Sequence, residues 1–486
     1  MRASGILLPI SSLPNSYGIG TFGKEAYAFI DFLKKCHQSY WQILPLGPVA
    51  FGDSPYQTYS TFAGDGNYLD LESLYEDGLL TKDELDSQVV TNTRVDYDGL
   101  RRNRMPLYKK LTKRFFANLP PDYDVFYQNN QEWLRTYCTY MALKTYYQGE
   151  SFNKWPTSAL KNKLPKTVKA AILEDEKMHA FIQYTFFKQW YKLKAYANRQ
   201  EIKIIGDLPI YVAYDSADVW SNPQNFELDE NYQPLRVAGC PPDAFSKDGQ
   251  LWGNPLYNYE EMAKDHFSWW IKRFAMALTL FDMVRIDHFR GFESYFAIPY
   301  GEKTARNGVW VKAPGLAIFN ELKRVLGSVN LIAEDLGFLT PAVYQLLKQT
   351  GFPGMRVLEF AFDGNDNNAY LPHNYLENTV VYTGTHDNLP LAGWVKTLSN
   401  QELECCYKFT HCLGPKELPK QIVKMAMGSI ANLAITPLQD YLELDATARI
   451  NTPGTVGINW KWRLDGHLLT NELIEYIRNL TIKYYR

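Results

Sequence analysis

Long apolar runs are missing from this chain of 486 residues. No stretch reaches the roughly 18 apolar residues that a membrane-spanning helix needs, and the apolar run after Met1 is too short for a signal peptide. Runs of like charge are missing as well, because 51 Lys and Arg are interspersed with 53 Asp and Glu, which leaves a net charge of −2. We therefore expect no membrane partner, no nucleic-acid partner and no export.

Cysteine is scarce and irregularly spaced, with six residues and no C-x-x-C pair. This usage is typical of reduced thiols in the cytoplasm rather than of a disulfide framework. Cys406, His411 and Cys412 lie close together, but their spacing fits no zinc template, so we expect no metal and no other cofactor. Aromatic residues, in contrast, make up 15% of the chain, which is a weak indication of sugar-binding surfaces because most such rings simply fill a large core.

Short apolar runs recur along the chain, each ending in polar residues or a Gly/Pro break and usually followed by a helical pattern. Runs without strict alternation are typical of parallel strands buried on both faces, and eight strand–helix units favour a barrel over an open doubly wound sheet. The fold class expected is therefore α/β, a (β/α)8 TIM barrel. The eight runs are Gly5–Pro9, Trp41–Pro45, Ile202–Leu208, Met283–Asp287, Leu331–Leu336, Met355–Phe360, Thr379–Thr383 and Leu433–Thr436.

Two intervals between these runs are too long for simple connections. We expect one catalytic barrel over residues 1–486, with a mostly helical inserted subdomain at 60–200 and an inserted loop subdomain at 211–261 that is rich in Pro, Gly, Asn and Asp. After the eighth run only a helix of roughly 470–485 is expected. The chain therefore leaves no room for a C-terminal β-sandwich domain.

Acidic residues end four of the eight runs, in the segments Gly206-Asp207, Arg285-Ile286-Asp287-His288, Ala333-Glu334-Asp335 and Thr385-His386-Asp387-Asn388. Because the strands of such a barrel end on one rim, we expect these acids to meet there. One such acid alone could be a helix N-cap, but several flanked by arginine and histidine indicate a shared site. The cations argue against a hard-metal site, and the Asp363–Asp366 segment resembles a calcium loop only superficially. Paired carboxylates favour glycosyl transfer.

The motifs Met283–Gly291, Ile332–Gly337 and Thr383–Asn388 resemble the α-amylase superfamily and, within it, the amylomaltases or 4-α-glucanotransferases of glycoside hydrolase family 77. Three further stretches resemble that family: Ser12–Gly20, Trp41–Gln57 and Val237–Pro255. The resemblance extends from about residue 5 to 460. It implies transfer of α-1,4-glucan segments to glucose or maltooligosaccharides, and no cofactor.

The resemblance also assigns roles. It implies that Asp287 is the nucleophile, Glu334 the general acid/base and Asp387 the stabiliser of the transition state. Arg285 should keep Asp287 ionised, and burial should raise the pKa of Glu334. Substrate contacts are implied for a further set of residues: Arg285, His288, His386, Asp207, Tyr56, Trp252, Asp243 and Gln250.

One departure from the general amylase pattern supports the narrower family. Tyr211 and Val212 stand where many amylases carry Asn and His, so a calcium requirement is not expected. We expect the Pro241–Asn254 loop, with Phe245 and Trp252, to act as a lid that excludes water and favours transfer.

Three alternatives stay open from the residues alone. An α-glucan hydrolase shares the first chemical step, and a non-catalytic glucan-binding protein would not need the complete acid set. The stretch Gly18–Gly23 matches G-x-G-x-x-G, but the second strand ends in Leu44-Pro45 without the acidic residue that a dinucleotide-binding fold requires.

Overall fold

Eight parallel strands form a closed barrel at the centre of the molecule, in the spatial order β1-β12-β11-β10-β9-β6-β3-β2. The structure is a computed structural model, and it describes residues 2–242, 247–337 and 339–486. Each of the eight apolar runs overlaps one strand, so the barrel expected from the sequence is confirmed. The strands are β1 (Ala3–Leu7), β2 (Tyr40–Gln42), β3 (Lys203–Leu208), β6 (Met283–Ile286), β9 (Leu331–Ala333), β10 (Gly354–Val357), β11 (Thr379–Tyr382) and β12 (Leu433–Pro437).

Most residues of the barrel strands are apolar because both faces of these strands are covered. All four residues of β11 and all five of β12 are buried, as expected for strands with side chains in the barrel interior on one face and helices on the other. The surrounding helices are α1 (Lys24–Lys35), α10 (Ser268–Leu280), α11 (Gly315–Leu326), α12 (Pro341–Thr350), α13 (Leu391–Trp394), α14 (Asn400–Thr410), α15 (Leu418–Gly428), α16 (Leu438–Tyr441) and α17 (Asn471–Lys483).

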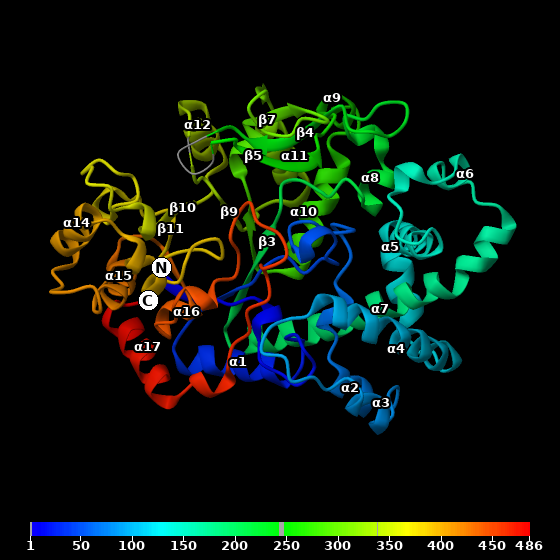
Figure 1. Cartoon of the computed structure of the whole chain (residues 1–486), viewed down its shortest axis with the longest axis horizontal. Helices are drawn as coiled ribbons and strands as arrows, with labels where there is room; N and C mark the ends of the chain where they lie inside the picture. Colours follow the sequence, from blue (N-terminus) through cyan, green and yellow to red (C-terminus); the bar gives the residue numbers. More distant parts are fainter. Residues whose placement is uncertain (1, 243–246, 338) are drawn as a thin grey trace.

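Six helices lie between β2 and β3, in the interval expected to be helical. Figure 1 shows α4 and α5 beside the long helix α7, away from α14, α15 and α17. The Trp190 side chain of α7 is fully buried and donates from Nε1 to the Leu280 carbonyl at 3.1 Å, which ties these helices to the barrel. The six are α2 (Leu71–Glu76), α3 (Lys82–Asp86), α4 (Tyr97–Ala117), α5 (Tyr123–Tyr146), α6 (Thr157–Leu160) and α7 (Lys166–Arg199).

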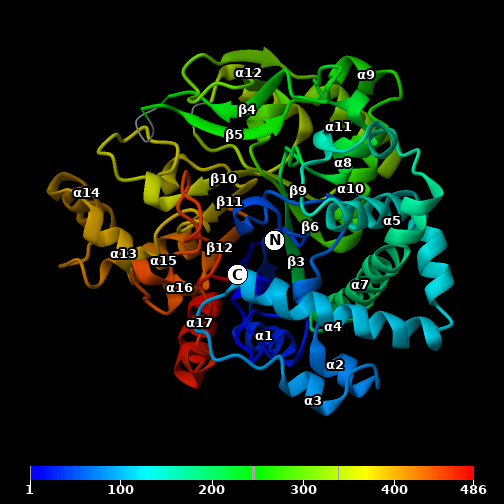
Figure 2. The same ribbon diagram turned by 45° about the vertical axis from the view of Figure 1, so that its right-hand side comes forward.

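A second, antiparallel sheet lies outside the barrel, with strand order β5-β4-β7-β8. Its strands come from two separate connections between barrel strands. The strands β4 (Arg236–Cys240) and β5 (Gln250–Pro255) lie between β3 and β6, whereas β7 (Ser294–Pro299) and β8 (Val309–Lys312) lie between β6 and β9. Figure 2 shows β4 and β5 on the side of the barrel opposite to α2 and α3. The described part of the interval 211–261, expected to be an ordered loop region, thus contains β4, β5, the helix α8 (Ala217–Ser221) and the start of α9 (Tyr259–Ala263).

The chain after β12 forms α16, two short 3-10 turns, α17 and the loops that connect them. Among the described helices, none combines the length and the apolar character that a membrane crossing needs.

Candidate active site

Four acidic side chains meet at the carboxyl ends of the barrel strands. Asp207 is the next-to-last residue of β3, Asp287 directly follows β6, Glu334 directly follows β9, and Asp387 lies in the loop after β11. This is the rim at which barrel enzymes build their sites, because the loops of all eight units converge there.

Arg285 joins two of these acids. Its Nη1 donates to Oδ2 of Asp207 at 2.6 Å, and its Nη2 donates to Oδ1 of Asp287 at 2.9 Å. Arg285 and Asp287 are two positions apart, so the strand directs both side chains to the same face. The Arg285 side chain is only 4% exposed, whereas that of Asp287 is 30% exposed. The arginine therefore fixes the Asp287 carboxylate while leaving it open to a ligand.

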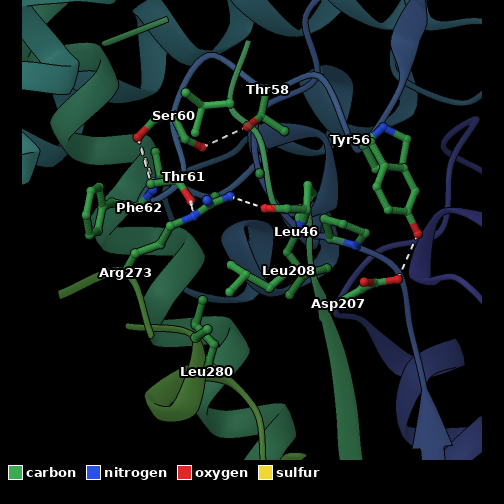
Figure 3. Close-up of a pocket in the computed structure, with 18 of the residues that line it drawn as sticks. Leu46, Tyr56, Thr58, Ser60, Thr61, Phe62, Asp207, Leu208, Arg273 and Leu280 are labelled. Carbon is green, nitrogen blue, oxygen red and sulfur yellow. Dashed lines mark hydrogen bonds between the residues drawn. The ribbon is translucent and has the colours of Figure 1, made fainter. Parts of the chain in front are cut away.

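Asp207 is the most deeply placed of the four. Its Oδ2 also accepts a hydrogen bond of 2.7 Å from the Tyr56 hydroxyl, which Figure 3 shows directed at the carboxylate. Burial raises the pKa of Asp207, and the positive charge of Arg285 opposes that rise. The guanidinium of Arg285 already bonds Oδ2 of Asp207 and Oδ1 of Asp287, so an additional cation would have to compete with it for these oxygens.

A pocket beside Asp207 separates the loop after β2 from β3 and α10 (Figure 3). Arg273 of α10 donates to the Ile210 carbonyl at 2.8 Å and to the Thr61 hydroxyl at 2.7 Å. These bonds connect the loop after β2, which carries Tyr56, to the loop after β3, which follows Asp207.

Glu334 is held by two backbone N–H groups. Its Oε1 accepts from Leu336 at 2.9 Å, and its Oε2 accepts from His288, the residue after Asp287, at 2.7 Å. Burial raises the pKa of Glu334 to about 8; the charge of Arg285 opposes this rise and that of Asp287 adds to it. The raised pKa expected from the sequence is confirmed, so Glu334 carries a proton at neutral pH beside an acid paired with arginine.

Asp387 is held by His386 and by two residues that the sequence did not indicate. Its Oδ1 accepts a hydrogen bond of 2.6 Å from Nδ2 of Asn451 and lies 3.3 Å from Nε2 of His386, while its carbonyl accepts from Arg449 at 2.6 Å. Asn451 and Arg449 belong to the loop after β12. Their position after the last barrel strand was the one signal that could have indicated them.

Aromatic rings line the site on two sides. The rings of Tyr56 and His386 are stacked 5.2 Å apart, and Trp460 lies 5.7 Å from Tyr56. On the other side, Trp252 of β5 meets the ring of His288 edge-on at 4.9 Å and donates from Nε1 to the Gln250 side chain at 3.0 Å. The second sheet thus brings Trp252 and Gln250 to the barrel rim.

His288 combines an unusual backbone with a buried ring. Its φ of 51° is left-handed, which turns the chain after Asp287 and aims the His288 N–H at Glu334. Burial lowers the pKa of the imidazole to about 4, so the ring is neutral at pH 7, although the charge of Asp287 opposes this effect. Within the described part of the chain, its Nε2 has no hydrogen-bond partner.

Three acidic or aromatic residues named from the sequence are not part of the site as described. Asp243 lies outside the described residues, as does Phe245. Asp335, next to Glu334, is structural: it accepts from the Met355 N–H at 2.6 Å and from Arg356 at 3.0 Å, and thereby joins β9 to β10.

A closed parallel barrel with clustered carboxyl groups, a buried arginine and aromatic walls at the carboxyl ends of its strands is typical of carbohydrate-active barrel enzymes, and this is the class that the fold and the site indicate. A family profile described as 4-alpha-glucanotransferase matches residues 8–470. The chain therefore belongs to glycoside hydrolase family 77, the 4-alpha-glucanotransferases, and is a glycosyl-transferring enzyme.

Individual relatives agree with this assignment. The chain is 45% identical to a 4-alpha-glucanotransferase of Clostridium butyricum over 98% of this chain and 99% of that protein. A solved amylomaltase of Streptococcus agalactiae, in complex with acarbose, is 39% identical and superimposes with a TM-score of 0.97 over the whole of both chains. An amylomaltase of Corynebacterium glutamicum, 18% identical, shares the fold with a TM-score of 0.81 over 99% of this chain and 75% of that one.

Proposed function

We propose that the protein transfers segments of α-1,4-glucan from a donor chain to the 4-hydroxyl of glucose or of a maltooligosaccharide, by a retaining double displacement. One observation carries this mechanism: Asp287, held by Arg285, lies beside a protonated Glu334. The Glu334 carboxyl group accepts a hydrogen bond from the backbone N–H of His288, the residue after Asp287. A retaining reaction needs these two groups: a carboxylate to attack the sugar and an acid to assist the leaving oxygen.

In the first step Asp287 attacks the anomeric carbon while Glu334 gives its proton to the glycosidic oxygen, and the reducing-end fragment departs. A covalent sugar ester on Asp287 remains. In the second step Glu334, now a carboxylate, takes the proton from the acceptor hydroxyl, which attacks the ester and restores both groups.

Asp387 is proposed to stabilise the positive charge that develops on the sugar ring between these two steps. Its carboxylate is 41% exposed toward the rim, and Asn451 holds one of its oxygens. Contacts to the sugar are proposed for the remaining candidate residues: Arg285, Asp207, Tyr56, His288, His386, Trp252, Gln250 and Asp243.

Transfer requires that a sugar hydroxyl, and not water, reach the ester. We propose that the Pro241–Asn254 segment excludes water, supported by the position of Trp252 against His288.

We also propose that the chain is one catalytic barrel with two insertions, at 60–200 and 211–261. A cytoplasmic location is proposed on the basis of free thiols at Cys36, Cys138, Cys405, Cys406 and Cys412.

Incubation with maltotriose alone tests the proposal. A transferase produces glucose and a ladder of longer chains while the number of reducing ends stays constant. A rise in reducing ends would identify a hydrolase, and unchanged maltotriose would indicate binding without catalysis. Asp287→Asn and Glu334→Gln should each reduce turnover by about 1000-fold or more without unfolding the protein, and near-normal turnover in either would refute the assigned roles.

A further inference from the structure

Glu359 is a buried acid that the proposed mechanism does not use. It follows β10 in the short 3-10 turn Leu358–Phe360, and its N–H donates to the Thr383 carbonyl at 3.2 Å. Its Oε2 accepts a hydrogen bond of 3.0 Å from Nδ2 of Asn388. Its Oε1 is buried and has no hydrogen-bond partner among the residues that the structure describes.

Hydrogen bonds connect this carboxyl group to the backbone of Asp387. Oδ1 of Asn388 accepts from both the N–H and the hydroxyl of Thr385, each at 2.9 Å. The Thr385 hydroxyl oxygen in turn accepts from the Asp387 N–H at 3.2 Å. Three consecutive links therefore lead from Glu359 to the backbone N–H of Asp387.

We propose that Glu359 is a positioning residue of the transfer reaction: it holds Asn388, and through Asn388 and Thr385 it sets the turn that presents Asp387. The inference rests on the role proposed above for Asp387. The hydrogen bonds of Glu359 within the described residues go to Thr383 and Asn388, so its proposed effect on the reaction is indirect.

Close packing makes the link stiff. A Cβ atom added at Gly384, in the turn between β11 and Asp387, would lie 2.8 Å from Oε1 of Glu359 and 3.2 Å from Cβ of Asn388. The turn therefore rests directly on the Glu359 carboxyl group. Removal of this group would leave a cavity and would remove both the hydrogen bond from Asn388 and the packing contact with Gly384.

The carboxyl group can perform this role without a charge. Burial raises the pKa of Glu359 well above its ordinary value and the charge of Asp440 adds to the rise, whereas the hydrogen bond from Asn388 and the charge of Arg449 oppose it. A neutral carboxyl group still accepts the Asn388 hydrogen bond. A glutamine amide has the same shape and offers the same acceptor, so it is the conservative replacement.

Steady-state kinetics on maltotriose test the inference. Glu359→Ala should lower kcat by about 10-fold or more with KM changed by less than about 3-fold, because the ground-state sugar contacts stay in place. Glu359→Gln should retain at least about a third of wild-type kcat. Leu322→Ala, a fully buried change on α11, is the matched control: it should destabilise the fold by a similar amount and leave kcat unchanged.

Thr385→Val removes the hydroxyl that bonds both Asn388 and the Asp387 N–H, at nearly constant volume and with the backbone bond to Asn388 kept, and it decides the question if Glu359→Ala does not fold. It should lower kcat by about 10-fold as well, and its combination with Glu359→Ala should lower kcat little further, because both changes break one chain of bonds. Wild-type kcat in Glu359→Ala or Thr385→Val, or a Glu359→Gln variant as slow as Glu359→Ala, would overturn the inference.

Asp387→Asn, measured in parallel, distinguishes a failure of the role proposed for Asp387 from a failure of the inference about Glu359. If Asp387→Asn keeps its turnover, the role proposed for Asp387 is wrong and the inference fails with it. If Asp387→Asn is inactive while Glu359→Ala and Thr385→Val turn over normally, the inference alone is wrong.

Discussion

Asp287→Asn removes a negative charge beside Glu334, and in the proposed mechanism the formation of the sugar ester on Asp287 removes the same charge. The charge of Asp287 adds to the raised pKa of Glu334. Neutralising it should therefore make Glu334 a stronger acid. The variant thus imitates the electrostatics of the intermediate, in which Glu334 has to act as a base.

The size of the effect follows from Coulomb's law. Two unit charges about 5.5 Å apart, the spacing of a retaining pair, interact by about 3 kcal/mol at an effective dielectric constant of about 20. That energy is about a 100-fold change in the protonation equilibrium. With a pKa of about 8, Glu334 is mostly protonated at pH 7, and after the change it should be mostly ionised. One charge change thus converts the acid into a base.

Carbon-13 NMR of labelled glutamate carboxyl groups measures this titration, with the Glu334 signal assigned by its loss in Glu334→Gln. The midpoint should lie near pH 8 in the wild type and clearly lower in Asp287→Asn. In the wild type, kcat/KM should fall as the pH rises above about 8, because the proton needed by the leaving group is lost. Identical titrations in the two proteins, or a wild-type midpoint near 4.5, would refute the reasoning.

Three other changes have defined outcomes. Asn451→Ala removes the 2.6 Å bond to Asp387 and should lower kcat by about 10-fold to 100-fold in steady-state assays, with a smaller effect on KM. Arg285→Lys cannot reach Asp207 and Asp287 together, so kcat should fall by about 100-fold; unchanged kinetics would show that the paired geometry is unimportant. Burial raises the pKa of Asp440 to about 7, so the folded state retains a proton that the unfolded chain loses above pH 4. Stability should therefore fall between pH 4 and 7 by about 4 kcal/mol relative to Asp440→Asn in urea unfolding, and parallel curves would contradict this.

Prediction from sequence succeeded where the signal is local. Each barrel strand is a short run of buried apolar residues, and both faces of such a strand need apolar side chains whichever strands become its neighbours. Asp287 and Glu334 directly follow their strands, so once a barrel is inferred their shared rim follows from the fold. Arg285 and Asp287 are two positions apart, which already places them on one face.

The second sheet could not be found in this way. Strands β4 and β7 pair as Val237 with Ile298 and Gly239 with Phe296, although β6 lies between them in the chain. Such pairing depends on where the barrel places two separate loops. A Pro- and Gly-rich interval gives no local sign of it.

The amino-acid sequence by itself determined the succession of strand–helix units and the acids at the strand ends, because burial and strand periodicity act over a few residues. Only the tertiary structure decided which groups tune those acids. Asn451 reaches Asp387 across 64 positions, and Glu359 reaches Asn388 across 29. These contacts exist because β11 pairs with β10 on one side and with β12 on the other, which brings the loops at their carboxyl ends together. Hydrogen bonds and charges act over distances in space rather than along the chain.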